Sequence, residues 1–112
     1  MSTITTHVLD TSRGRPAAEL KIELHLKTGE TWKSVGLGVT DENGRCAALL
    51  GETPLTSGTY RLTFHAGAYF KAHHIETFYA DIPVVFEVRD ARAHYHVPLL
   101  LSPFGYSTYR GS

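Results

Sequence analysis

The chain has 112 residues, 42% of them hydrophobic, which is the size of one globular domain with a single core. Its 11 basic residues balance 11 acidic residues, so no net charge would attract nucleic acid or an anionic membrane. The longest apolar run, Val97–Leu101, contains Pro98 and is too short to cross a bilayer. We therefore expect one domain, residues 1–112, with no nucleic-acid or membrane partner.

The N-terminal segment and the cysteine content bear on the cellular compartment. Met1–Thr6 lacks the basic and apolar regions of a signal peptide. Cys46 is the only cysteine, so no intrachain disulfide and no cysteine-based zinc site can form. These features predict a protein of the reducing cytoplasm.

Three segments alternate apolar and polar residues, as strands with one buried face do. Their apolar positions are Leu20, Ile22, Leu24 and Leu26, then Tyr60, Leu62 and Phe64, then Ile82, Val84, Phe86 and Val88. Turn signals occur at residues 13–16, 28–30, 41–44 and 56–58. Only residues 67–74 are suited to a short helix, with Tyr69, Phe70 and His73 or His74 on one side. The pattern predicts an all-β fold, an antiparallel sandwich or barrel.

The segment from Tyr95 to Leu101 breaks the alternation. Its odd positions form an ordinary core face, but the opposite face carries Pro98 and Leu100 beside two histidines. A strand with apolar residues on both faces normally has both faces covered. A sandwich of this size has no third layer, so we infer that a second subunit covers the outer face. The alternative is that Pro98 and Leu100 are merely exposed.

Four side chains are candidates for chemistry. His94 and His96 are two apart in a strand and share a face, while His7 and Arg45 lie elsewhere in the sequence. If they converge, one imidazole could accept a proton from water and another could donate to a leaving nitrogen. The guanidinium could bind carbonyl groups and offset oxyanion charge. This set suits acyl hydrolysis.

Each candidate also has a plainer interpretation. A single strand histidine such as His7 is more often a surface residue than a catalyst, and Arg45 beside a turn is usually solvated. His94 and His96 could instead bind zinc or copper, although no cysteine or nearby carboxylate supplies a third ligand. From the residues alone, an oligomeric β-sandwich with a possible histidine-lined site is predicted, and no substrate.

Three stretches carry a resemblance to a known family. Thr6–Pro16, Asp41–Arg45 and His94–Ser112 resemble the signatures of the 5-hydroxyisourate hydrolases in the transthyretin-like family. The likeness runs along essentially the whole chain, and the closing segment Tyr109–Ser112, which reads Tyr-Arg-Gly-Ser, is its most specific part.

The resemblance implies a transthyretin-like β-sandwich of two four-stranded sheets with one short helix. It implies a homotetramer, a dimer of dimers, with a channel between the dimers. It also implies cofactor-free, metal-free hydrolysis of the N1–C6 amide of 5-hydroxyisourate. The product is 2-oxo-4-hydroxy-4-carboxy-5-ureidoimidazoline, on the route from urate to allantoin.

By resemblance, His7, Arg45, His96, Tyr109 and Ser112 line a site built from more than one subunit. Either His7 or His96 would be the general base toward water, and the other would orient or protonate. Arg45 would bind the substrate, and Ser112 would position substrate or water. The rival function is a transthyretin-like carrier of a small hydrophobic ligand, whose channel should be lined by apolar and hydroxyl groups.

Overall fold

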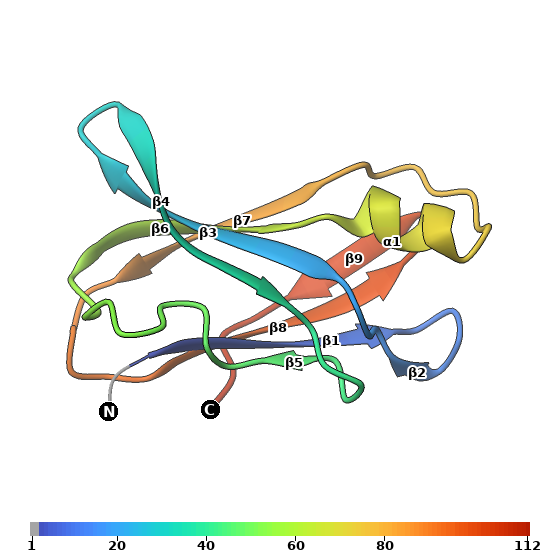
Figure 1. The fold of residues 1–112 in the computed structure, drawn as a ribbon, viewed down its shortest axis with the longest axis horizontal. Coiled ribbons are helices and arrows are strands. Elements are labelled where there is room, and N and C mark those ends of the chain that lie inside the picture. The colour runs from blue at the N-terminus through green and yellow to red at the C-terminus, as the bar shows by residue number, and fades with distance from the viewer. Residues whose placement is uncertain (1–2) are drawn as a thin grey trace.

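The computed structural model describes residues 3–112, so Met1 and Ser2 of the segment examined for a signal peptide lie outside it. Two β-sheets pack face to face, with one short helix at one end of the sandwich (Figure 1). The elements, in chain order, are β1 (Ile4–Asp10), β2 (Arg15–Pro16), β3 (Lys21–Thr28), β4 (Thr31–Val39), β5 (Arg45–Cys46), β6 (Gly58–Phe64), α1 (Ala66–Ala72), β7 (Ile82–Val88), β8 (Tyr95–Ser102) and β9 (Gly105–Thr108).

One sheet runs β2-β1-β8-β9, and β5 also pairs with β1. Since β8 runs parallel to β1 along its whole length, the two-residue strands β2 and β5 share the opposite edge of β1. The expected two-sheet sandwich with one helix is confirmed. The two short strands together occupy the fourth position of this sheet, which gives it five strands in place of the four expected.

The other sheet is antiparallel, in the order β4-β3-β6-β7. The three alternating segments of the sequence are its strands β3, β6 and β7, as predicted. The sequence pattern did not reveal β4, because Gly36 and Gly38 interrupt its alternation. A methyl group at Gly36 would collide with the carbonyl oxygen of Leu49. The glycines therefore let the segment after β5 pack directly onto β4.

The core lies between the sheets and is continued under α1. The odd positions of β8 are buried in this core, as expected. The helix buries Tyr69 and Phe70 as predicted, but it ends at Ala72 and leaves His73 and His74 exposed. Within residues 3–112, no helix is long and apolar enough to cross a membrane.

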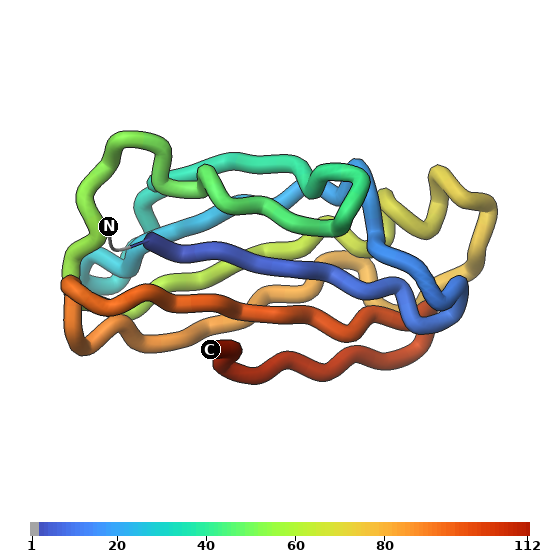
Figure 2. The backbone as a smooth tube through the Cα atoms, turned by 90° about the horizontal axis from the view of Figure 1, so that it is seen from below, coloured from blue at the N-terminus to red at the C-terminus, as the bar shows by residue number. Residues whose placement is uncertain are grey.

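The outer face of β8 is only partly as expected. Leu100 is 38% exposed, but Pro98 is buried within this single chain. The C-terminal segment folds back beside β8 (Figure 2). There Gly111 lies against Pro98, so the chain itself covers Pro98. Only Leu100 still supports the inference that a second subunit covers this face.

Candidate active site

Strand register brings the predicted histidines and arginine to one face of the first sheet. Thr5 of β1 lies beside His96 of β8, and His7 lies beside Arg45 of β5. Residues two apart in a strand share a face, so His94 also projects outward with His96. The neighbours that alternate with them are buried in the core. Three segments far apart in sequence therefore meet on one outer surface.

A tight turn holds Arg45 at this surface. Asp41 Oδ1 accepts hydrogen bonds from the amides of Asn43 and Arg45, both at 2.9 Å. Gly44 has a φ of +75°, and a methyl group there would lie 2.4 Å from the carbonyl oxygen of Val8. Its own carbonyl accepts the Val8 amide at 2.8 Å. Glycine is therefore required where the turn rejoins β1, and that junction sets Arg45 opposite His7.

A pocket opens on this face. Its lining consists of Thr5, Thr6, Arg45, Cys46, Ala47, His94, His96 and Ser112. It combines an exposed guanidinium, two imidazoles and the C-terminal serine, so it presents polar groups to a ligand. His7 is outside this lining but adjoins it, because its neighbour Arg45 and its electrostatic partner His96 both lie in the pocket wall.

His96 has the most unusual environment of these residues. Its Nδ1 lies 2.8 Å from the Thr5 hydroxyl, which leaves Nε2 as the nitrogen available to the pocket. Partial burial lowers the pKa of His96, and the nearby His7, His94 and Arg45 lower it further. Both effects disfavour the imidazolium ion. His96 is therefore neutral near pH 7 and can accept a proton.

The C-terminal segment packs onto this histidine. The Gly111 amide donates a hydrogen bond to the His96 carbonyl at 2.8 Å. A methyl group at Gly111 would lie 2.6 Å from Cδ2 of the His96 ring, so the glycine backbone contacts the imidazole closely. Ser112 then enters the pocket wall.

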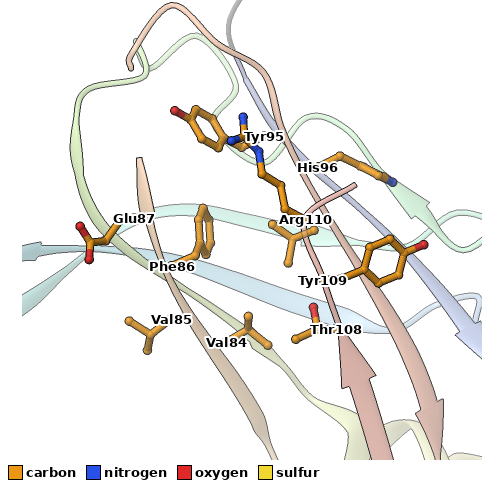
Figure 3. A pocket seen from close by; sticks show the side chains of 10 residues that line it. Val84, Val85, Phe86, Glu87, Tyr95, His96, Thr108, Tyr109 and Arg110 are labelled. Atoms are coloured by element: carbon orange, nitrogen blue, oxygen red, sulfur yellow. The ribbon is translucent and has the colours of Figure 1, made fainter. Parts of the chain in front are cut away.

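Tyr109 lies in a different place from Ser112. It lines a neighbouring, mostly apolar pocket between β7 and the C-terminal segment (Figure 3). In that pocket the Arg110 guanidinium lies 4.6 Å from the centre of the Tyr95 ring. Within this single chain, His96 borders both pockets.

The alternative interpretation, in which His94 and His96 bind a metal ion, depends on where their ring nitrogens point. Nε2 of His94 and Nδ1 of His96 both point to the Thr5 hydroxyl, at 3.2 and 2.8 Å. Across residues 3–112, no group of three or more His, Cys, Asp or Glu residues is arranged to hold a metal ion.

The comparisons with known proteins agree with the sequence signatures. The model of the HIUase/Transthyretin family matches residues 4–111. The chain belongs to this family. It is 47% identical to 5-hydroxyisourate hydrolase 2 of Rhizobium meliloti over 97% of this chain and 95% of that protein.

Solved structures place it among both kinds of protein that the family name mentions. The 5-hydroxyisourate hydrolase of Klebsiella pneumoniae is 36% identical, with a TM-score of 0.88 and full coverage of both chains. Sea bream transthyretin in complex with thyroxine is 32% identical, with a TM-score of 0.91 over 97% of this chain and 94% of that one. The chain also spans 44% of a longer protein, (S)-allantoin synthase, at 42% identity and a TM-score of 0.88.

Because both kinds of family member share this fold, the pocket residues have to discriminate between functions. Sequence reasoning missed Thr5, which lines this pocket, and gave no separate role to Gly111, which packs against His96 beside it. Thr5 could have been found, since it lies two positions before His7 and must share its face. Gly111 could not, because its contact with His96 depends on how the chain returns after β9.

Proposed function

We propose that this chain hydrolyses 5-hydroxyisourate to 2-oxo-4-hydroxy-4-carboxy-5-ureidoimidazoline. Its relatives named 5-hydroxyisourate hydrolase support the choice of substrate. The observation that carries the proposal is the partly buried His96, whose lowered pKa keeps it neutral beside the cationic Arg45. A neutral imidazole next to a fixed positive charge is what water activation and oxyanion stabilisation require.

In the proposed reaction, Nε2 of His96 takes a proton from water while the water oxygen bonds to the C6 carbonyl carbon. The Arg45 guanidinium binds the carbonyl oxygen as negative charge develops on it. The C6–N1 bond then breaks, and a protonated His7 delivers its proton to N1. Afterwards His96 releases one proton to solvent and His7 takes one back. Water is thereby divided between the new carboxyl group and the released nitrogen, and no cofactor takes part. Ser112 positions substrate or water in the same pocket.

The rival function, a carrier of a hydrophobic ligand, draws support from the similarity to a thyroxine-bound transthyretin. The pocket argues against it. A carrier channel gains affinity from apolar walls, but here two imidazoles and a guanidinium enter the lining.

The direct test is to generate 5-hydroxyisourate with urate oxidase and to follow its absorbance with and without the protein. We expect the protein to accelerate the decay well beyond the spontaneous rate. Equal decay in both samples, with the enzyme folded, would remove the hydrolase proposal. Saturable binding of a hydrophobic ligand without turnover would favour the carrier.

We also propose that the active form is a homotetramer, and that Tyr109 reaches a shared site through a partner subunit. Leu100 supports this assembly because it is an apolar side chain, 38% exposed, beside the pocket residues of the outer sheet face. Leu100→Glu should dissociate the assembly, since contact would bury an unpaired charge. Leu37→Glu is the control, because Leu37 is 69% exposed on the other sheet.

Sedimentation and activity should be measured together for both variants. We expect Leu100→Glu to lose the tetramer and the activity, and Leu37→Glu to keep the tetramer and the activity. A fully active monomer of Leu100→Glu would contradict the shared site. In the same proposal, residues 1–112 act as a single hydrolase domain, and location in the cytoplasm remains a prediction.

A further inference from the structure

One hydroxyl group on the outer sheet face joins two imidazole rings. Thr5 Oγ1 lies 2.8 Å from Nδ1 of His96 and 3.2 Å from Nε2 of His94. Thr5 is half-buried and His94 is exposed in this chain. His96 lines the pocket with Arg45. A continuous path of hydrogen-bonding atoms therefore runs from the half-buried ring of His96 to the exposed ring of His94 at the same pocket.

The chemistry of a hydroxyl restricts how this path can be protonated. A hydroxyl has a single hydrogen to donate, so it can donate to only one of the two rings. The other ring must then donate its own N–H to Oγ1. When neutral His96 has its single N–H at Nδ1, this N–H donates to Thr5 Oγ1, and the Thr5 hydrogen must point to His94. Nε2 of His96 then keeps a free lone pair. The direction of this one hydroxyl decides which nitrogen of His96 can act as a base.

Resting on the proposed function, we propose that Thr5 is a positioning residue that fixes the tautomer of His96 before the reaction, and that Thr5 and His94 together form a proton relay between His96 and solvent.

The relay balances as follows. Nε2 of His96 takes the proton released by water. The proton on Nδ1 of His96 passes to Thr5 Oγ1, and the former hydroxyl proton of Thr5 passes to Nε2 of His94. His96 and Thr5 end neutral, with His96 now in its other tautomer. His94 ends as an imidazolium, and its charge balances the oxyanion formed on the substrate. The exposed ring of His94 then releases a proton to buffer. The starting tautomer returns when Nε2 of His96 loses its proton to solvent and a proton taken up by His94 passes back through Thr5 to Nδ1.

Other charged and titratable groups face His96 from the surrounding elements. His7 approaches from β1, Arg45 from β5 and His94 from the segment just before β8, while Ser112 comes from the C-terminal segment. Glu87 of β7 and Arg110 line the second pocket that His96 borders. The two histidines and the arginine disfavour positive charge on His96. A proton that reached His96 would therefore move readily to a ring farther toward solvent, which is the direction the relay provides.

Thr5→Val and Thr5→Ser form a matched pair. Valine keeps the β-branched shape of threonine in a strand but has no hydroxyl, whereas serine keeps the hydroxyl. We expect Thr5→Val to lower kcat by about tenfold with KM nearly unchanged, less than the roughly hundredfold loss for removing a general base. Thr5→Ser should recover most of the rate. Equal kcat in the valine and serine variants would overturn the positioning role.

His94→Ala tests the second half of the path. We expect its kcat to fall at low buffer concentration and to rise again with added imidazole, because a free base can accept the proton from Thr5. Thr5→Val should not be rescued, because the link to His96 is missing. A His94→Ala variant with wild-type kcat at every buffer concentration would remove the relay.

One measurement separates this inference from the hydrolase proposal. Nitrogen-15 NMR of the imidazoles reports the tautomer of His96 without any substrate. We expect one defined tautomer in the wild-type protein and in Thr5→Ser, and a mixed or reversed one in Thr5→Val. If the wild-type protein fails to hydrolyse 5-hydroxyisourate but this pattern holds, only the proposed function fails. An unchanged His96 tautomer in Thr5→Val overturns the positioning role whatever the activity.

Discussion

Two histidines, His65 beside the sheet that contains β3 and His96 in the sheet that contains β8, have opposite surroundings. His65 follows β6 and caps the start of α1, and its two ring nitrogens lie 2.6 Å from Glu23 and 3.1 Å from Asp81. Both nitrogens are thus engaged by carboxylates. The ring ties together β3, the helix start and the segment before β7, and neither nitrogen is left for a ligand.

His96 has one engaged nitrogen, and among residues 3–112 its ring makes no hydrogen bond or ion pair with a carboxylate. Its Nδ1 meets the Thr5 hydroxyl, and the nearby charges that act on it belong to His7, His94 and Arg45. These neighbours favour a neutral imidazole with a lone pair available on His96. The comparison teaches that the environment, rather than residue type, separates a structural histidine from a candidate base.

The largest expected effect comes from deleting Tyr109–Ser112. The deletion removes the Gly111 amide that bonds the His96 carbonyl, takes Ser112 out of the pocket wall and uncovers Pro98. We expect no turnover above the spontaneous reaction, although chain ends usually tolerate change. The readout is 5-hydroxyisourate decay with circular dichroism as the folding check.

The other histidine provides the control for this deletion. None of the residues around His65 lies in the C-terminal segment, so its NMR signals should stay where they are. Full activity in the truncated chain would mean that the segment marks ancestry and has no part in the site.

Paired substitutions of the two histidines should give the next largest effect. His96→Asn should lower kcat by roughly a hundredfold or more, the usual loss for a general acid or base. His65→Asn should leave kcat near wild type but lower Tm, because it breaks the link between Glu23 and Asp81. Similar kinetics for the two variants would show that the contrast in environment has no catalytic meaning. His7→Asn is expected to behave like His96→Asn.

Arg45 is expected to have an intermediate effect. Arg45→Lys keeps the charge but loses the planar fork, so we expect kcat/KM to fall about tenfold, short of the roughly hundredfold loss of a full oxyanion donor. Wild-type kinetics in this variant would make Arg45 an ordinary surface charge.

The pH profile separates the charge of Arg45 from its shape. Because the pKa of His96 is lowered, its neutral form persists below the ordinary range, and activity should be lost as pH falls through that lowered pKa. Arg45→Lys should leave this acid limb in place. Arg45→Gln removes one of the charges that depress the pKa, so the limb should move to higher pH. An identical limb in both variants would contradict the assigned electrostatics.

The sequence predicted the strands whose two faces differ in polarity, because burial of one face imposes a period of two. It missed β4, where Gly36 and Gly38 replace side chains so that a following loop can approach. It also extended α1 to His74, although the chain leaves the helix after Ala72 and His74 has a φ of +59°. Local pattern carries no information on such tertiary packing.

The sequence predicted most residues of the site, but it did not predict the strand pairing that brings them together. The face shared by His94 and His96 follows from strand periodicity, while His7 and Arg45 were placed there by resemblance. Their convergence needed the parallel pairing of β1 with β8, a long-range register that no local pattern specifies. The same limit applied to Tyr109, which lines a different pocket from His96 and Ser112 only because of the course of the chain after β9.

The smallest expected effect tests whether backbone packing holds the His96 ring. In Gly111→Ala the new methyl group would lie 2.6 Å from Cδ2 of His96 and 3.2 Å from Cγ of Pro98, so the ring or the C-terminal segment must shift. An off-rotamer side chain costs roughly 0.5–1.5 kcal/mol, which corresponds to about a two- to tenfold loss in rate. Gly105→Ala is the matched control, because its methyl group would meet Ser102 Oγ at an ordinary 3.7 Å. We expect kcat to fall in Gly111→Ala and to stay at the wild-type value in Gly105→Ala. The His96 resonances should move only in Gly111→Ala, whereas those of His65 should move in neither variant. If Gly111→Ala keeps the wild-type rate and spectrum, the C-terminal segment only fills space beside His96, and the deletion phenotype would then belong to Ser112 or Tyr109.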